Sequence, residues 1–231
     1  MALRFDAASG GTTDTPATSL TIAHTCAGAN GLITVPVQIK NNGSQTVTGV
    51  TYNGVALTLK AAVNNGTNIR SELWYLVAPA TGANNIVITA SASTRFTGGG
   101  ISFNGADQTT PLGTAATATG NDTAPSVAVS AASGDIVIDS MAYMGINGTG
   151  LPTASVGSGQ TERFNQSATG GIGTEDKYVG GAGSTEAGAA SVTMDWTLSD
   201  TTQWATIGVA VKPVSTPAAT ASGAALLMAM L

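Results

Sequence analysis

Seven carboxylates are the residues of this chain whose type suits general acid–base chemistry, because a glycosidase needs two Asp or Glu side chains flanking the bond that it breaks. Each also has a structural interpretation as a turn residue, an outward strand residue or part of a solvated edge. Their spacing indicates neither a catalytic pair nor a calcium loop of the EF-hand type. The seven candidates are Asp107, Asp135, Asp139, Glu162, Glu175, Asp176 and Asp195.

The only histidine and the only cysteine add little to this chemistry. His24 lies in an alternating run without the Ser and Asp pattern of a triad, and one histidine excludes a two-histidine metal site. Cys26 excludes a disulfide within the chain, and it is typical of a small buried apolar residue. The glycine-rich stretches 98–100 and 180–183 lack the Lys and helix context of a phosphate loop, so we interpret them as turns or loops. We predict no catalytic residue, no cofactor, no metal and no enzyme activity.

Composition and charge argue against nucleic acid and membrane as partners. Charged residues make up 9% of the 231 residues, against roughly 25% in ordinary soluble domains. The net charge is −5 and the eight basic residues are scattered singly, unlike the clustered footprint that nucleic acid requires. No run reaches the ~18 apolar residues of a membrane span, and the first residues do not form a secretory signal. We expect an exterior type of protein made without an export signal, as virion proteins are.

Period-two alternation of apolar and polar residues dominates the chain, and helical periodicity is almost absent. It predicts about a dozen short strands separated by turns, such as the hairpin at Asn53-Gly54. Residues 108–124 are interpreted as a long connection and 147–159 as a loop. The fold class is therefore all-β: a single antiparallel β-sandwich, jelly-roll-like, of two sheets. The predicted core residues are Leu57, Leu73, Ile88, Val137, Val192, Ile207 and Val209.

The three tryptophans all fall on predicted strands, at Trp74, Trp196 and Trp204. Large aromatic side chains carry much of the burial in a sandwich, so we interpret them as core anchors. The alternative is a platform on which a sugar ring stacks.

The domain plan has three parts: an N-terminal arm (1–16), the sandwich (17–213) and a flexible linker with an apolar C-terminal tail (214–231). The linker is rich in Ala, Ser and Thr. The tail either folds back on its own domain or docks on a neighbouring subunit. The candidate docking residues are Leu226, Leu227, Met228, Met230 and Leu231.

Six segments along the chain are distinctive as a set. They are V-T-Y-N-G-V-A-L-T-L (50–59), E-L-W-Y-L-V-A-P (72–79), G-A-D-Q-T-T-P-L-G (105–113), G-Q-T-E-R (159–163), G-A-A-S-V-T-M (188–194) and Q-W-A-T-I-G-V-A (203–210). Together they resemble β-sandwich modules of tailed-phage and bacterial genomes, some of them capsid cement or decoration proteins and others parts of surface proteins. The resemblance covers roughly residues 17–213 and implies fold and setting, with no active site to carry over.

We therefore expect a structural virion protein: a decoration (cement) protein on the outer capsid surface of a tailed bacteriophage. It would bind the major capsid protein and copies of itself as a homotrimer, with neither nucleic acid nor membrane as partner. The alternative is a carbohydrate-binding or host-attachment module of a phage fibre or an extracellular bacterial surface protein. A glycoside hydrolase or lyase with paired carboxylates is a weaker third option.

Deletion of residues 217–231 should leave the sandwich folded and weaken its attachment to partners. Each buried Leu or Met side chain contributes about 1.5–3 kcal/mol, and between subunits of a symmetric shell this gain accumulates through multivalency. The measurements are the thermal midpoint of the isolated protein and its occupancy on capsids. A lowered midpoint with unchanged occupancy would place the tail in the core of its own domain.

Overall fold

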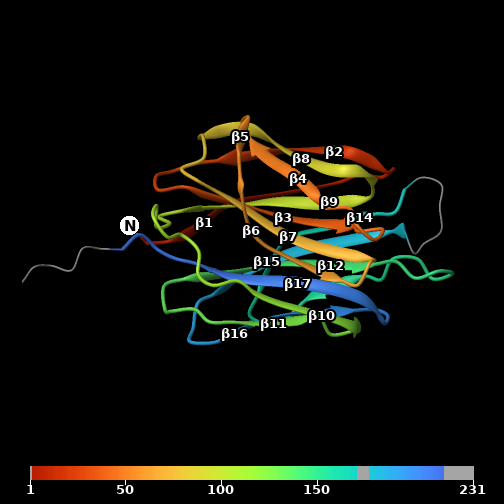
Figure 1. Ribbon diagram of the computed structural model, residues 1–231. Helices are drawn as coiled ribbons and strands as arrows, with labels where there is room; N and C mark the ends of the chain where they lie inside the picture. Colours follow the sequence, from red (N-terminus) through yellow and green to blue (C-terminus); the bar gives the residue numbers. More distant parts are fainter. Residues whose placement is uncertain (1, 171–176, 216–231) are drawn as a thin grey trace, which may run out of the picture.

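The computed structural model describes residues 2–170 and 177–215, and its regular elements are antiparallel strands in four sheets. The all-β sandwich arrangement is confirmed, with four layers in place of the two sheets expected (Figure 1). The upper outer sheet consists of β2 (Ala17–Cys26), β8 (Gly82–Thr94), β4 (Val47–Tyr52) and β5 (Val55–Ala56). The upper inner sheet consists of β1 (Arg4–Thr12), β9 (Phe96–Asn104), β3 (Leu32–Lys40), β7 (Ile69–Val77) and β6 (Thr58–Asn65).

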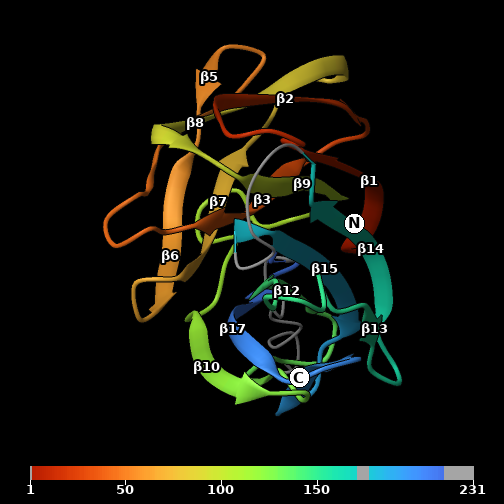
Figure 2. The ribbon, with the colours of Figure 1, turned by 90° about the vertical axis from the view of Figure 1, so that its right-hand side faces the viewer.

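The lower half of the stack repeats this plan. The lower inner sheet consists of β10 (Ala116–Asp122), β17 (Thr202–Val211), β12 (Ile136–Met144), β15 (Val179–Ala187) and β14 (Thr161–Ala168). The lower outer sheet consists of β11 (Ser126–Val129), β16 (Val192–Leu198) and β13 (Ala154–Val156). Figure 2, turned by 90°, shows β2, β5 and β8 of the upper outer sheet at the top and β17 and β10 of the lower half toward the bottom.

The two halves have the same topology and face each other reciprocally. Counted along the chain, the order β1-β9-β3-β7-β6 corresponds strand for strand to β10-β17-β12-β15-β14. Across the inner interface β3 meets β15 while its counterpart β12 meets β7, and β9 meets β15 while its counterpart β17 meets β7. Reciprocal contacts of this kind are the mark of a two-fold interface. The chain is thus an internal pseudo-dimer.

The core lies between each pair of adjacent layers. All seven predicted core residues are buried, with Leu57 the most exposed of them at 6%. Along β3 both faces are covered: Ile33 and Val35 pack toward the upper outer sheet, and Leu32 packs toward the lower half. A strand covered on both faces is expected to be rich in apolar residues, and all nine residues of β3 are buried.

The interface between the inner sheets has an apolar region at each end and a polar centre. Gln38 Nε2 donates to Ser140 Oγ at 3.0 Å, and Thr97 Oγ1 donates to Gln38 Oε1 at 2.9 Å. Ser71 Oγ lies 2.8 Å from the carbonyl oxygen of Ser140 and donates to it. All four residues are 0% exposed. Each of these hydrogen bonds therefore replaces one that the side chain would make to water in the unfolded chain.

Several boundaries differ from the sequence prediction. Residues 4–12 of the predicted arm form the edge strand β1, paired with β9. The predicted connection 108–124 contains β10, and the predicted loop 147–159 contains the short strand β13. In β10 small Ala and Thr side chains alternate, so its apolar pattern is weak in the sequence. Its pairing with β17 along its whole length holds it in the sheet.

The glycine-rich stretches 98–100 and 180–183 were wrongly interpreted as turns or loops, since they lie within β9 and β15. Large side chains occupy the space that a Cβ would need. A Cβ on Gly99 would overlap the Phe164 ring, and one on Gly181 would overlap the side chains of Gln38 and Thr97. Glycine therefore lets the sheets approach closely at these positions.

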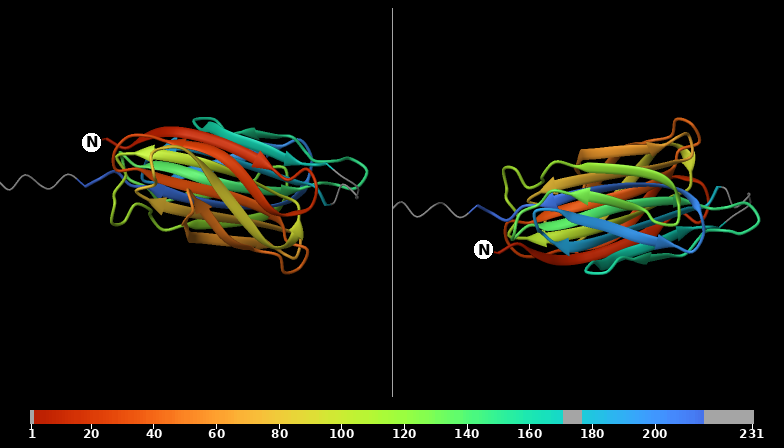
Figure 3. Two further views of the ribbon diagram at one scale, coloured as in Figure 1. Left: turned by 90° about the horizontal axis from the view of Figure 1, so that it is seen from above. Right: turned by 90° about the horizontal axis from the view of Figure 1, so that it is seen from below.

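The start of β1 and the end of the described chain meet at one end of the molecule. Val214 N donates to the carbonyl oxygen of Gly105 at 2.8 Å, and a Cβ on Gly105 would lie within 2.5 Å of the carbonyl oxygen of Ala2. Both views in Figure 3 show this common end.

Replacement of Gly181 by Ala should destabilise the fold by about 1–3 kcal/mol, because the added methyl group overpacks the inner interface. Gly49→Ala is the matched control, since no heavy atom lies within 4 Å of its Cβ position, and its effect should stay within about 0.5 kcal/mol. Urea denaturation measures both free energies of unfolding. Equal stability of the two variants would contradict the close approach of the sheets.

Candidate functional site

The outer face of the β2-β8-β4-β5 sheet is the candidate functional surface. Its four strands contain no Asp, Glu, Lys or Arg, and their only histidine, His24, is buried. Alternation places Leu20, Ile22 and Ile88 in the core and the intervening residues outside. We call this surface the neutral face; it consists of Ser19, Thr21, Ala23, Thr51, Asn85, Val87 and Thr89.

The neutral face is built by regular pairing. Thr21 lies opposite Val87, which lies opposite Thr51, and the next row joins Ser19 to Thr89. Such rows present hydroxyl, methyl and amide groups on one twisted sheet. The sequence carries a signal for this surface that is not a motif: the runs 15–39, 41–59 and 73–94 contain no Asp, Glu, Lys or Arg.

A shallow groove of about 480 Å³ crosses one end of the neutral face. Asn53, Asn84 and Asn85 supply amide groups to it, while Ala23 and Val87 supply apolar contacts. Asn53 occupies the first loop position of the predicted Asn-Gly hairpin with φ 50°, and Gly54 follows with φ 77°. This geometry matches the turn type that the dipeptide favours and aims the loop along the groove's edge.

The tryptophans are core anchors, as predicted, and each indole N–H donates to a carboxylate. Trp74 Nε1 donates to Glu72 Oε2 at 2.8 Å, and Trp204 Nε1 donates to Asp122 Oδ1 at 3.0 Å. The third, Trp196, has 2% exposure. These rings lie inside the layers, so they do not form the sugar-stacking platform that was the alternative.

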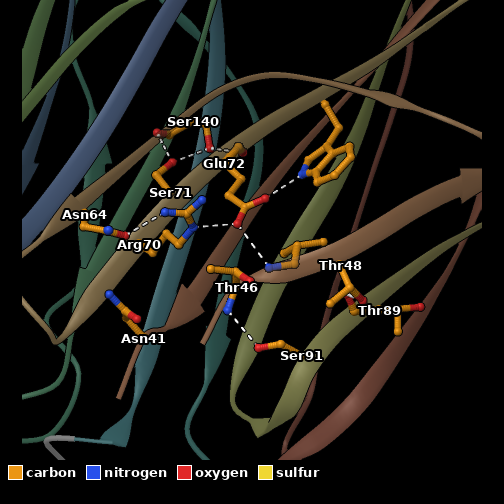
Figure 4. A network of polar contacts seen from close by, with 12 residues as sticks. Asn41, Thr46, Thr48, Asn64, Arg70, Ser71, Glu72, Thr89, Ser91 and Ser140 are labelled. Atoms are coloured by element: carbon orange, nitrogen blue, oxygen red, sulfur yellow. Dashed lines mark hydrogen bonds and ion pairs between the residues drawn. The ribbon is translucent and has the colours of Figure 1, made fainter. Parts of the chain in front are cut away.

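Glu72 is a buried hub on β7 that no motif indicated. Its Oε1 accepts from Arg70 Nε at 2.6 Å and from Val47 N at 3.1 Å (Figure 4). The hydrogen bond from Val47 N joins β7 to β4 of the outer sheet, while Arg70 and Trp74 contact Glu72 from β7 itself. The carboxylate therefore ties the neutral face to the layer beneath it, because each buried oxygen needs its donors.

Asp139 is the one predicted carboxylate that is fully buried. Its Oδ2 accepts from Trp196 Nε1 at 2.6 Å and its Oδ1 accepts from Ser184 N at 2.6 Å. Burial raises its pKa to about 6, although the hydrogen bonds from Trp196 and Ser184 oppose the shift. Because its oxygens meet protein donors inside the lower half, Asp139 serves structure and lies away from any described groove.

Each of the other predicted carboxylates that the structure describes accepts hydrogen bonds from a donor of its own. Asp107 Oδ1 accepts from Thr109 N and Thr110 N at 2.8 Å each, and these hydrogen bonds lower the pKa of the exposed carboxyl group. Asp135 Oδ2 accepts from Ala132 N in a turn. The remaining described pair hydrogen-bonds to amides: Glu162 to Asn165, and Asp195 to Gln160. Glu175 and Asp176 lie outside the described residues.

His24 and Cys26 are buried, in agreement with their structural interpretation. Ser9 Oγ on the neighbouring strand β1 lies 2.9 Å from His24 Nδ1, a contact that the sequence pattern did not reveal. Burial lowers the pKa of His24, with a weaker opposing effect from Asp6, and burial also raises the pKa of the Cys26 thiol. Both shifts favour the neutral forms, which suits side chains that fill space between β1 and β2.

Within residues 2–170 and 177–215, no three His, Cys, Asp or Glu side chains gather in a group that could hold a metal ion. The described part of the chain has no helix long and apolar enough to cross a membrane. The predicted docking residues Leu226, Leu227, Met228, Met230 and Leu231 lie outside the described residues.

Comparison of the chain with protein-family models, with curated proteins and with solved structures finds no match.

The raised pKa of Asp139 predicts that the free energy of unfolding falls as the pH rises. An acid with a folded-state pKa of about 6 and an unfolded value near ~3.9 contributes stability that is complete below pH ~4 and lost as the pH rises through about 6. The loss between these limits is on the order of 2–3 kcal/mol. Urea denaturation of the wild type and of Asp139→Asn across this range should show the slope only in the wild type.

Asp107→Asn is the matched control for this measurement. The Asp107 pKa is lowered, so its stabilising contribution is lost only as the pH falls through that depressed value, below the range tested. This variant should keep the wild-type slope. An equal slope in Asp139→Asn would contradict the assignment.

Proposed function

We propose that the protein is a structural virion protein, a decoration (cement) protein on the outer capsid surface of a tailed bacteriophage. In this proposal it binds the major capsid protein and copies of itself, as a homotrimer, through adhesion without turnover. The neutral face is the observation that carries the proposal. It is a broad sheet surface of hydroxyl, methyl and amide groups whose strands lack Asp, Glu, Lys and Arg.

Such a face suits burial against another protein surface. Burying a hydroxyl or an amide costs much less than burying an unpaired charge, and partner backbone groups can satisfy it. Ordinary surfaces carry many more charges, and interfaces are depleted of charge at their centres. A weak contact suffices on a shell, since many copies bind the same repeating lattice.

The layer beneath the neutral face is closely packed and is joined to the face by a hydrogen bond. Ile86 and Ile88 below the face are 0% exposed, and Glu72 fixes β4 to β7 through its bond from Val47 N. The face therefore keeps its shape when it is bound, which lowers the ordering cost of association.

A carbohydrate-binding or host-attachment module is the second candidate, and the groove on the neutral face favours it. The amide groups of Asn53 and Asn85 line this groove and have no side-chain hydrogen bond within the described residues. Amides of this kind hydrogen-bond to sugar hydroxyl groups. Binding of neutral oligosaccharides that is lost in Asn53→Ala and Asn85→Ala, with capsid attachment unaffected, would select this function.

A charge placed on the neutral face should weaken attachment. Thr89→Lys introduces an ammonium group on β8, where docking would bury it without a partner at a cost of several kcal/mol. The control is Thr197→Lys, an exposed threonine on β16, the central strand of the opposite outer sheet. Sedimentation with shells assembled from the major capsid protein that the proposal requires as partner measures occupancy.

We expect wild-type occupancy for Thr197→Lys and at least about tenfold weaker binding for Thr89→Lys, since 1.4 kcal/mol already changes affinity tenfold. Equal binding by both variants would show that the neutral face is not part of the interface. Absence of binding by the wild-type protein would refute the cement function itself.

A further inference from the structure

The pseudo-dimer brings an edge strand of one inner sheet next to an edge strand of the other at two places. β1 lies beside β14, and the counterpart strands β10 and β6 lie beside each other. We call these the first edge and the second edge. Both β14 and β6 carry a β-bulge, and the residue at each bulge is basic: Arg163 between Glu162 and Phe164, and Lys60 between Leu59 and Ala61.

The first edge is closed by a cation–π contact. The guanidinium carbon of Arg163 lies 3.6 Å from the centroid of the Phe5 ring, and Arg163 Nε donates to Thr185 Oγ1 at 2.8 Å. The bulge thus turns a basic side chain over an aromatic ring that the neighbouring strand supplies. Contacts of this kind are favourable because the face of the ring carries negative charge.

The second edge has the same plan without the ring. Phe5 pairs with Phe103, whereas Leu112 pairs with Val211 in the other half. Phe103 and Val211 are themselves equivalent, since each lies opposite the first residue of the third strand of its sheet. Leu112 therefore stands where Phe5 stands, and Lys60 stands where Arg163 stands.

At this second edge the surface is hollowed. A groove of about 570 Å³ runs along β6 and the segment 110–117, with Ala61, Leu112 and Ala115 as its apolar lining. Lys60 and Lys212 also line it. Within the described residues neither ammonium group has a hydrogen bond or an ion pair. Two unpaired positive charges beside an apolar lining, on a protein of net charge −5, select an anionic and partly apolar ligand.

The groove also runs along an open sheet edge. β6 is the last strand of its sheet, and its far end is held by Asn65, whose Nδ2 donates to the carbonyl oxygens of Gly120 at 2.7 Å and Trp204 at 3.0 Å. Toward Lys60 no such bond joins β6 to the opposite segment among the described residues. An extended peptide can therefore align with β6 through its backbone groups.

We propose that this groove binds an extended segment of a partner protein that carries an aromatic residue next to a carboxylate. The aromatic ring packs between Lys60 and Leu112, in the hollow at the second edge where the Leu112 side chain stands in place of a Phe ring, and the carboxylate pairs with Lys212. The site is separate from the neutral face and does not depend on it.

The test uses the segment that already occupies the first edge. A fluorescein-labelled peptide copying residues 2–9 with the Arg4→Ser change keeps the Phe-Asp pair, and fluorescence anisotropy measures its binding to the full chain. Lys60→Gln and a Phe→Ala peptide should each weaken binding about two- to fivefold, the size of an exposed cation–π contact. The double variant Lys60→Gln/Lys212→Gln should weaken it about tenfold or more, because two charged contacts are lost.

The matched control is Arg4→Gln, which removes one exposed positive charge from β1 at the opposite edge of the same sheet. It should bind the peptide with wild-type affinity, and all variants should keep the wild-type thermal midpoint. Equal weakening by Arg4→Gln and Lys60→Gln would reduce the effect to net charge and overturn the proposal. Binding that survives the double variant would show that the peptide displaces β1 instead, and would overturn it as well.

Discussion

The close contact between the two inner sheets is the constraint on which the rest of the structure depends. Its centre is filled by the hydroxyl and amide groups of Gln38, Ser71, Thr97 and Ser140, all of them buried. A group of this kind is stable only when each member finds its partner. A shift of one residue along any inner strand would turn these side chains to the opposite face and leave them unpaired. The network thus fixes the register of both halves at once.

Much of the strand content could be predicted from the sequence because burial alternates along the chain. The seven core residues belong to runs such as 86–90 and 202–211, where apolar side chains recur at every second position. β3 is buried on both faces, and most of its residues are apolar, with Thr34, Gln38 and Lys40 as the exceptions. These signals are local, and local patterns survive in a single sequence.

The arrangement of the layers could not be predicted in the same way. The offset between equivalent strands differs from pair to pair, as β3 and β12 begin at Leu32 and Ile136 whereas β7 and β15 begin at Ile69 and Val179. Gly99 and Gly181 look like turn residues until the ring of Phe164 or the amide of Gln38 is placed beside them. The contacts of Trp196 with Asp139 and of Ser9 with His24 likewise depend on tertiary placement. The sequence indicates the neutral face only by the absence of charged residues, which is not a motif.

The presence of both halves in one chain has a genetic consequence. In a true homodimer every substitution appears twice, so a change that suits one side of the dyad is imposed on the other. Here the two sides are encoded separately. The contact of Arg163 with the Phe5 ring closes the first edge, while Lys60 and Leu112 leave the second edge accessible. Selection can therefore change each edge independently, and one edge can evolve a binding function that the other does not have.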